Sequence, residues 1–227
     1  MKTARKHPAT SAFLAAPLRL LLLAALLAGG CEDDDDGGVG GGGGGDFGDR
    51  DPTHCAVAGD SIAVGYGDAG APWPARLAAM LGRPVANFSA GGARMTGQGP
   101  SQVGSAIGSK AGFIIIALGA NDAINGADPE GVKAVLGALI ERVRAVKAVP
   151  VVGNVIRMTG EHALFDGNVD AINAAIGDVC GREGVMLVNL HGAVSEGMLQ
   201  PGGLHPNSDG QEAIARAFHG KLKGRVE

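Results

Sequence analysis

From residue 53 onward, short apolar runs alternate with stretches in which apolar residues recur every three or four positions. This alternation is typical of repeated strand–helix units, and such units build a parallel sheet covered by helices on both faces. We therefore expect an α/β fold whose site lies at the carboxyl ends of the strands. The runs predict five strands, at residues 55–58, 85–88, 113–118, 149–155 and 185–190.

The clearest helix is predicted at residues 129–147, where seven apolar side chains fall on one face. Asp128 precedes it as an expected N-cap, and Pro129 suits the first turn because it needs no backbone donor there. Further helices are predicted at residues 74–81, 165–180 and 208–220.

The amino-terminal 30 residues have the pattern of an export signal: four basic and no acidic residues, then the apolar run 20–28. Nine apolar residues are too few to span roughly 30 Å of hydrocarbon. The sequence before Cys31 resembles a bacterial lipoprotein signal, which implies that Cys31 becomes the lipidated first residue of a membrane-anchored mature protein in the cell envelope. The alternative is an ordinary secretory signal with an incidental cysteine, which would give a soluble secreted or periplasmic protein.

Residues 31–52 are acidic and rich in glycine, and such a segment cannot supply the apolar face that a core needs. We expect a flexible tether there and a single folded domain at residues 53–227. Residues 52–227 carry a net charge of −1 by formal count. A nucleic-acid partner is therefore not expected, because binding one requires a basic surface.

Two cysteines remain within the predicted domain, Cys55 in an apolar run and Cys180 at the end of a helical pattern. An oxidising envelope would permit them to pair, whereas two separate buried thiols are the other reading. The sequence leaves both open.

Four of the loops that follow or precede these elements carry residues suited to acyl transfer. Ser61 follows the first strand and could be a nucleophile, although a helix-capping serine has the same local sequence. Gly92 follows the second strand, where a glycine lets a backbone N–H approach a ligand closely. Asn121 follows the third strand and could donate to an oxyanion. His205 precedes the last helix and could reach Ser61 only through the fold.

Gly-Asp-Ser near the start of the domain, Gly92, Gly-x-Asn-Asp and Leu-His-Pro-Asn, in this order, resemble the motifs of the SGNH hydrolases, also called GDSL esterases and lipases. The resemblance covers residues 53–220. It implies a flavodoxin-like three-layer α/β/α sandwich and hydrolysis of carboxylic esters through an acyl-serine intermediate. It also implies that Ser61 is the nucleophile, that His205 is the general base, and that Ser61, Gly92 and Asn121 form the oxyanion hole.

The chain departs from this pattern at Gly202, where the family usually has an aspartate three residues before the histidine. We hypothesise that a backbone carbonyl near Gly202 accepts the Nδ1–H of His205 instead, which would leave a serine–histidine dyad. Asp60 and Asp122 match the family motifs and are interpreted as residues that order their loops.

No metal-ligand spacing links the histidines, and residues 65–70 fit a dinucleotide motif only in form, because they begin six residues after the strand ends. We therefore expect no metal and no cofactor. The predicted function is an envelope-anchored hydrolase of small-molecule, lipid or polysaccharide acyl esters. The rival is a binding lipoprotein on the same fold that has lost turnover, a reading motivated by Gly202.

Overall fold

The computed structural model describes residues 46–68 and 70–226. The export signal predicted at residues 1–30, the lipidation site at Cys31 and most of the predicted tether lie outside the described residues, so these predictions stay predictions. Among the residues that are described, no helix combines the length and the apolar character needed to cross a membrane.

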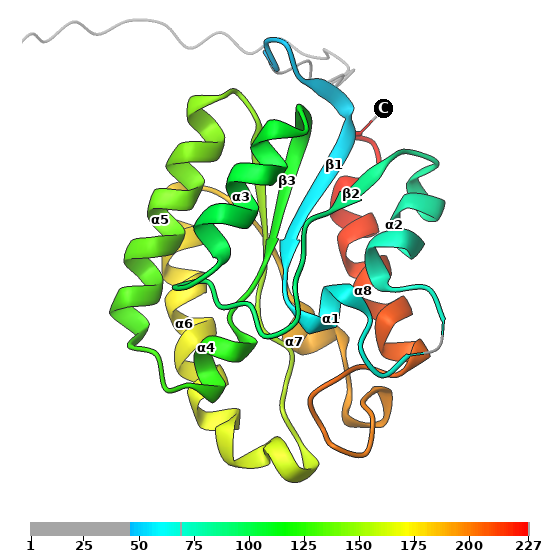
Figure 1. Cartoon of the computed structure of the whole chain (residues 1–227), viewed down its shortest axis with the longest axis vertical. Coiled ribbons are helices and arrows are strands. Elements are labelled where there is room, and N and C mark those ends of the chain that lie inside the picture. The colour runs from blue at the N-terminus through cyan, green and yellow to red at the C-terminus, as the bar shows by residue number, and fades with distance from the viewer. Residues whose placement is uncertain (1–45, 69, 227) are drawn as a thin grey trace, which may run out of the picture. The chain divides into compact units, whose positions relative to one another are not determined.

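Five parallel strands form one sheet with the order β2-β1-β3-β4-β5. Figure 1 shows β1 between β2 and β3. All five predicted strands are present, and the predicted α/β fold is confirmed. Their bounds are β1 Asp51–Gly59, β2 Val85–Asn87, β3 Ala111–Ala117, β4 Val149–Gly153 and β5 Met186–Val188.

Helices cover both faces of this sheet and make it the middle one of three layers. Helices α3, α5 and α6 pack on one face, while α2 and α8 pack together on the other (Figure 1). The helices are α1 Ser61–Val64, α2 Trp73–Leu81, α3 Gly99–Gly108, α4 Ala120–Ile124, α5 Pro129–Ala145, α6 Asp166–Glu183, α7 Leu190–Ala193 and α8 Ser208–Leu222, with 3-10 turns η1 Gly160–Phe165 and η2 Glu196–Met198.

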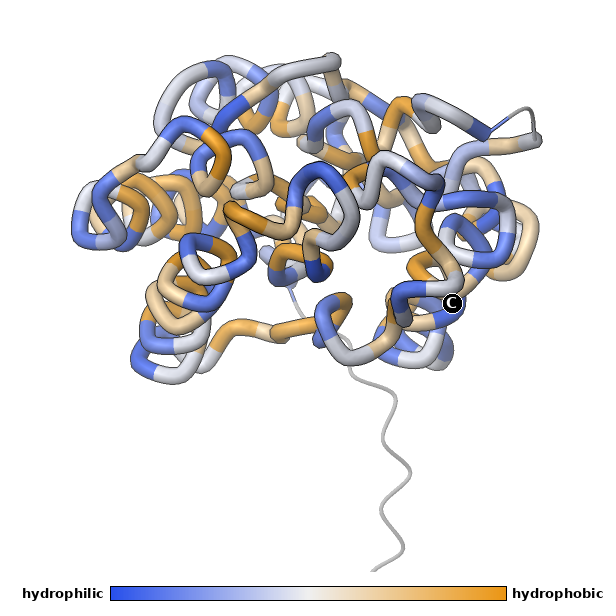
Figure 2. Tube along the Cα trace, turned by 90° about the horizontal axis from the view of Figure 1, so that it is seen from below, coloured by the Kyte–Doolittle hydropathy of each residue, from blue (hydrophilic) through white to orange (hydrophobic). Residues whose placement is uncertain are grey.

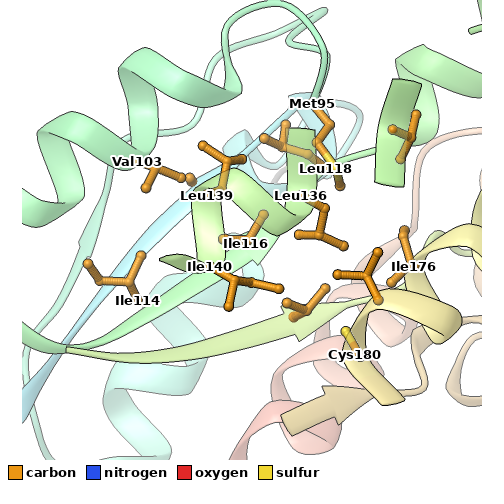
Figure 3. Packing of buried hydrophobic residues seen from close by; sticks show 14 of the residues in the cluster. Met95, Val103, Ile114, Ile116, Leu118, Leu136, Leu139, Ile140, Ile176 and Cys180 are labelled. Atoms are coloured by element: carbon orange, nitrogen blue, oxygen red, sulfur yellow. The ribbon is translucent and has the colours of Figure 1, made fainter. Parts of the chain in front are cut away.

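The central strand β3 supplies both halves of the core, because successive side chains of a strand point to opposite faces. Ile114 and Ile116 lie in the cluster beneath α3, α5 and α6 (Figure 3). Phe113 and Ile115 lie in the cluster on the other face, together with the Trp73 ring of α2. Figure 2 shows the hydrophobic residues gathered inside and the hydrophilic ones on the outer faces of the helices.

The sequence pattern located helices α2, α5, α6 and α8 but gave no range for α3 or for the short helices α1, α4 and α7. The predicted helix at 129–147 is α5, and the Asp128 side chain accepts hydrogen bonds from two backbone N–H groups of its first turn, as expected of an N-cap. Helix α3 contains three glycines and a proline, which are poor helix formers, so propensity gave no signal. It forms because Val103 and Ala106 bury one face against the sheet.

The two cysteines of the domain do not pair. Cys55 and Cys180 are both buried and free, and they belong to core clusters on opposite faces of the sheet. The sheet itself therefore separates the two thiols, and of the two readings the separate buried thiols hold. Burial raises the pKa of Cys55 to about 12 and that of Cys180 to about 11, so both are protonated near neutral pH.

Residues 46–52, which the composition assigned to the tether, pack against the domain. The ring of Phe47 lies 5.6 Å from that of Phe113. Arg50 is 7% exposed and donates to the backbone carbonyls of Ile107, Ala111 and Val146. The packed body therefore begins before residue 53, because a buried guanidinium and an aromatic ring are tied to it.

Candidate active site

The loops after β1, β2 and β3 and the loop before α8 carry the residues that the sequence singled out. Helices α1, α4 and α7 lie at this end of the molecule, opposite the start of β1 (Figure 1). Ser61 is the first residue of α1, directly after β1, and Asn121 lies in α4, directly after β3. Gly92 lies in the turn after β2, and His205 lies just before α8.

Ser61 and His205 meet although they are 144 positions apart in the chain. The hydroxyl Oγ of Ser61 lies 2.9 Å from Nε2 of His205, so the serine can donate its proton to the imidazole. Ser61 is 8% exposed. Burial lowers the pKa of His205, and the nearby His162 lowers it further. A neutral His205 is the form that can accept a proton.

Asp60 caps the short helix that begins with Ser61. Its carboxylate accepts a hydrogen bond of 2.9 Å from the N–H of Ile62. Burial raises the pKa of Asp60 to about 7; the Ile62 hydrogen bond acts in the opposite direction, and Asp122 adds to the rise. Asp60 therefore orders the loop, as interpreted from the sequence. The helix-capping role that was the alternative reading of Ser61 belongs to Asp60.

Three side-chain amides hold the segment around Ser61. Gln102 of α3 donates to the carbonyl of Gly59 at 3.0 Å, Asn87 donates to that of Ala63 at 2.8 Å, and Gln211 of α8 donates to that of Ile62 at 3.1 Å. Gln211 is fully buried and also accepts a 2.8 Å bond from the N–H of Trp73. Helix α1 is thus fixed from β2, α3 and α8 at once.

Neither glutamine was among the residues predicted from the sequence. Gln211 did carry a signal, because it falls on the apolar face of the last helix in register with Ile214, Ala215 and Phe218. A polar residue at such a position needs a buried partner. Gln102 carried no comparable signal, since its helix was not recognised.

The backbone N–H groups of Ser61 and Gly92 have no acceptor among the described residues. Gly92 has φ +74°, and a Cβ added there would meet no atom within 4 Å, so the space beside it is open. The backbone conformation explains why this residue is a glycine, since a positive φ is disfavoured for residues with a side chain. The two N–H groups are available to a ligand.

Asn121 and Asp122 support the same turn from α4. The Asn121 amide donates to the carbonyl of Ala93 at 3.1 Å and has a second N–H to offer. The carboxylate of Asp122, fully buried, accepts from the N–H of Met95 at 2.7 Å and from both the N–H and the hydroxyl of Thr96. Asp122 therefore fixes the chain that follows Gly92.

The hypothesis that a carbonyl near Gly202 accepts the Nδ1–H of His205 is wrong, because the Gly202 carbonyl is paired with another histidine. The Gly202 carbonyl lies 2.6 Å from Nδ1 of His162, and none of the described residues accepts a hydrogen bond from Nδ1 of His205. The reason is the turn that follows, because Gly203 has φ +76° and the Gly202 carbonyl faces η1. A Cβ on Gly202 would meet no atom within 4 Å, so packing does not exclude a side chain there.

One aromatic side chain stands beside the serine–histidine pair. The ring of Tyr66 lies 6.0 Å from that of His205 between centroids, and the residue is 51% exposed. Its hydroxyl is so close to Gly91 that a Cβ there would lie 2.7 Å away. The exposed Tyr66 ring therefore lies close to both His205 and Gly91.

Among the described residues, no three His, Cys, Asp or Glu side chains are grouped so that they could hold a metal ion.

A parallel sheet with helices on both faces and a serine–histidine contact at its carboxyl edge is the architecture of the SGNH hydrolases. The chain belongs to the GDSL-like lipase/acylhydrolase family, whose model matches residues 57–213. The family that the motifs indicated is therefore confirmed. No curated protein is significantly similar to the chain in sequence.

Solved structures share the fold at low sequence identity. TesA is 24% identical with a TM-score of 0.65, over 75% of this chain and 98% of its own. A catalytic mutant of Axe2, an acetylxylan esterase from Geobacillus stearothermophilus, is 17% identical with a TM-score of 0.64, over 75% and 93%. A putative lipolytic protein of the G-D-S-L family from Desulfitobacterium hafniense is 19% identical with a TM-score of 0.64, over 73% and 99%.

Proposed function

We propose that the protein hydrolyses carboxylic esters through an acyl-serine intermediate, with Ser61 as nucleophile and His205 as general base. The observation that carries this proposal is the 2.9 Å contact between the Ser61 hydroxyl and His205 Nε2 at the carboxyl edge of the sheet. Membership of a hydrolase family and a fold shared with esterases support it.

In the first half-reaction, Ser61 Oγ attacks the ester carbonyl carbon while its proton moves to His205 Nε2. The carbonyl π electrons move to the oxygen, which becomes an oxyanion. The tetrahedral intermediate then collapses, the bond to the alcohol oxygen breaks, and His205 returns its proton to that oxygen. The products of this half are a free alcohol and acylated Ser61.

The oxyanion is stabilised by donors that are in place before the substrate arrives. The N–H groups of Ser61 and Gly92 have no other acceptor among the described residues, and Asn121 adds a side-chain amide. Each such donor is typically worth about 10²–10³ in kcat. In the second half-reaction, the oxygen of a water molecule attacks the acyl carbon while His205 Nε2 takes a proton from that water. The bond between the acyl carbon and Ser61 Oγ then breaks, His205 returns the proton to Oγ, and the free acid leaves.

We further propose acyl esters of small molecules or polysaccharides as the substrate class. The fold relatives include an acetylxylan esterase, and the exposed ring of Tyr66 beside His205 offers a surface to the alcohol part of a substrate. Lysophospholipids are the competing class, favoured by the lipoprotein-like signal before Cys31.

The test is turnover of a chain-length series of p-nitrophenyl esters by the protein and by its Ser61→Ala variant. Turnover that disappears in the variant supports serine catalysis, and the preferred chain length indicates the depth of the acyl site. Absence of both turnover and fluorophosphonate labelling of Ser61 would overturn the proposal. Acetylated xylan and lysophospholipid, compared side by side, separate the two substrate classes.

We propose that the protein is anchored to the bacterial envelope through a lipid on Cys31, on the strength of the signal pattern alone. The measurement is incorporation of labelled palmitate in the producing cells. Labelling that is absent from the wild-type protein, or that persists in Cys31→Ser, would contradict the anchor.

A further inference from the structure

The imidazole of His162 lies against the loop that carries His205. His162 belongs to η1, between β4 and α6, and its Nδ1 lies 2.6 Å from the carbonyl oxygen of Gly202. A carbonyl only accepts, so Nδ1 of His162 carries the proton and donates it. Gly202 is three residues before His205, so this hydrogen bond holds the backbone close to the proposed base.

Around this hydrogen bond, the backbone of residues 159–160 packs against the backbone of residues 201–203. The N–H of Thr159 donates to the carbonyl of Gly203 at 2.9 Å. A Cβ on Gly203 would lie 1.9 Å from the Thr159 carbonyl oxygen, and one on Gly160 would lie 2.7 Å from that of Pro201. Glycine is therefore required on both sides, and η1 sets where the loop can lie.

From this interface, hydrogen bonds continue to the base itself. The N–H of Gly203 donates to the carbonyl of Gln200 at 2.8 Å, and the N–H of Gln200 donates to the carbonyl of His205 at 2.9 Å. A displacement of Gly202 or Gly203 is thus passed to the backbone of His205. The ring of His205 has no second hydrogen-bond partner among the described residues, so its orientation depends on this backbone.

The titratable and charged groups near His162 do not form an ion pair with its imidazole in the described part of the chain. Glu161, its neighbour in η1, is exposed, and Asp166 accepts from the N–H of Met158 at 2.8 Å. Across the interface the titratable group is His205, and on its own side His162 meets the ring of Phe165. No carboxylate among these forms an ion pair with His162 in the described part of the chain.

We propose that His162 is a positioning residue for His205. By donating from Nδ1 to the Gly202 carbonyl, it fixes the loop 200–205 and keeps His205 Nε2 within hydrogen-bond distance of Ser61 Oγ. This rests on the proposed function, because it assigns His162 a part in the chemistry of the same serine–histidine pair. His162 does not touch the reacting atoms.

Three substitutions test the geometry, because amides can replace either imidazole nitrogen. His162→Asn places an amide N–H near the position of Nδ1, His162→Gln places one near Nε2, and His162→Ala offers none. We expect kcat on a p-nitrophenyl ester to fall about tenfold in His162→Ala and His162→Gln, with KM unchanged, and to recover in His162→Asn. Unfolding midpoints of the three variants separate this effect from a loss of folding.

Wild-type kcat in His162→Ala, or an equally low kcat in His162→Asn and His162→Ala, would overturn the proposal. A readout that needs no turnover is the ¹⁵N chemical shift of His205 Nε2, which reports the hydrogen bond from Ser61. It should match the wild-type value in His162→Asn and move toward that of Ser61→Ala in the other two variants. If the wild-type protein cleaves no ester, the proposed function fails, and this shift still decides the role of His162.

Discussion

At the scale of single residues, Asp60 caps a helix although its burial disfavours the charged form of its carboxyl group. Its carboxylate caps α1, yet burial raises its pKa to about 7 from an ordinary value of 3.8. A folded-state pKa above the unfolded one means that the folded state binds the proton more tightly. The contribution of protonated Asp60 to the free energy of unfolding is therefore complete below pH 3.8 and is lost as the pH rises through about 7.

We predict that Asp60→Asn makes the protein more stable than the wild type above pH 7. Asparagine keeps an oxygen that can accept from the N–H of Ile62, and it does not ionise. The measurement is the unfolding midpoint from pH 4 to pH 8 for the wild type, Asp60→Asn and Asp60→Ala. The wild-type midpoint should decline across this range while that of Asp60→Asn stays flatter, and Asp60→Ala should be less stable because it lacks the cap. A parallel decline in wild type and Asp60→Asn would show that another group is responsible.

His205 gives the second prediction at this scale, which concerns the pH dependence of activity. A general base must be neutral, and burial together with His162 lowers its pKa from the ordinary 6.5. The base therefore stays neutral to lower pH, and activity should persist there. We expect kcat/KM to reach half its plateau below pH 6.5. A midpoint above this value would instead indicate a carboxylate near the imidazole, which raises its pKa.

At the scale of elements, the four-residue helix α1 is too short to hold itself in place, since isolated helices of this length are unstable in water. Side chains from neighbouring elements do so instead, and Gln211 joins α1 and α2 to α8. Because α8 begins three residues after His205, this one side chain connects the helix that carries Ser61 to the helix that follows His205.

We predict that Gln211→Leu destabilises the protein by about 2–4 kcal/mol, since it leaves the N–H of Trp73 and the carbonyl of Ile62 without partners. It should also lower kcat, because α1 carries Ser61. Urea unfolding and ester turnover measure the two effects. Gln211→Glu keeps the acceptor for Trp73 but places a buried carboxylate against the Ile62 carbonyl, so it should also destabilise the protein at neutral pH. A variant Gln211→Leu as stable as the wild type would contradict the bonding described here.

The elements themselves were predictable where burial decided them. The three inner strands β1, β3 and β4 contain apolar runs that are buried on both faces, which a sequence shows directly, whereas the edge strands β2 and β5 are only partly buried. Helix α5 shows a continuous apolar stripe with its cap. Helix α3 was not predictable, because its glycines and Pro100 argue against a helix and its stability comes from packing on β1 and β3. Local preference was overridden by tertiary contact in that element.

At the scale of the whole molecule, the order of four motifs along the chain located the site before any contact was known. Ser61 and His205 were expected to act together because the motifs that carry them resemble those of the SGNH hydrolases, and the site was expected at the carboxyl edge of the sheet. The partner of the Gly202 carbonyl was not predictable. His162 is 40 positions away, and a single histidine in a loop has no periodicity or spacing that marks it as a partner.

The amino-terminal limit of the folded body was also misjudged, and the reason lies in the difference between composition and contact. Acidic residues and glycines surround Arg50, so the segment looks like a tether. The guanidinium nevertheless donates to the last turn of α3, the residue after α5 and the start of β3, where helix ends leave carbonyls unpaired. One side chain thus joins two helices and the central strand.

We predict that Arg50→Ala lowers the unfolding midpoint by about 5–10 °C, which corresponds to about 3 kcal/mol for a domain of this size. The cost arises because three carbonyls lose a charged donor in a site that is almost closed to water. Arg50→Lys should recover only part of this stability, since an ammonium group lacks the planar fork that reaches three acceptors. Thermal unfolding followed by circular dichroism measures both variants. If Arg50→Ala unfolds at the wild-type temperature, the segment before residue 53 behaves as the tether that its composition suggested.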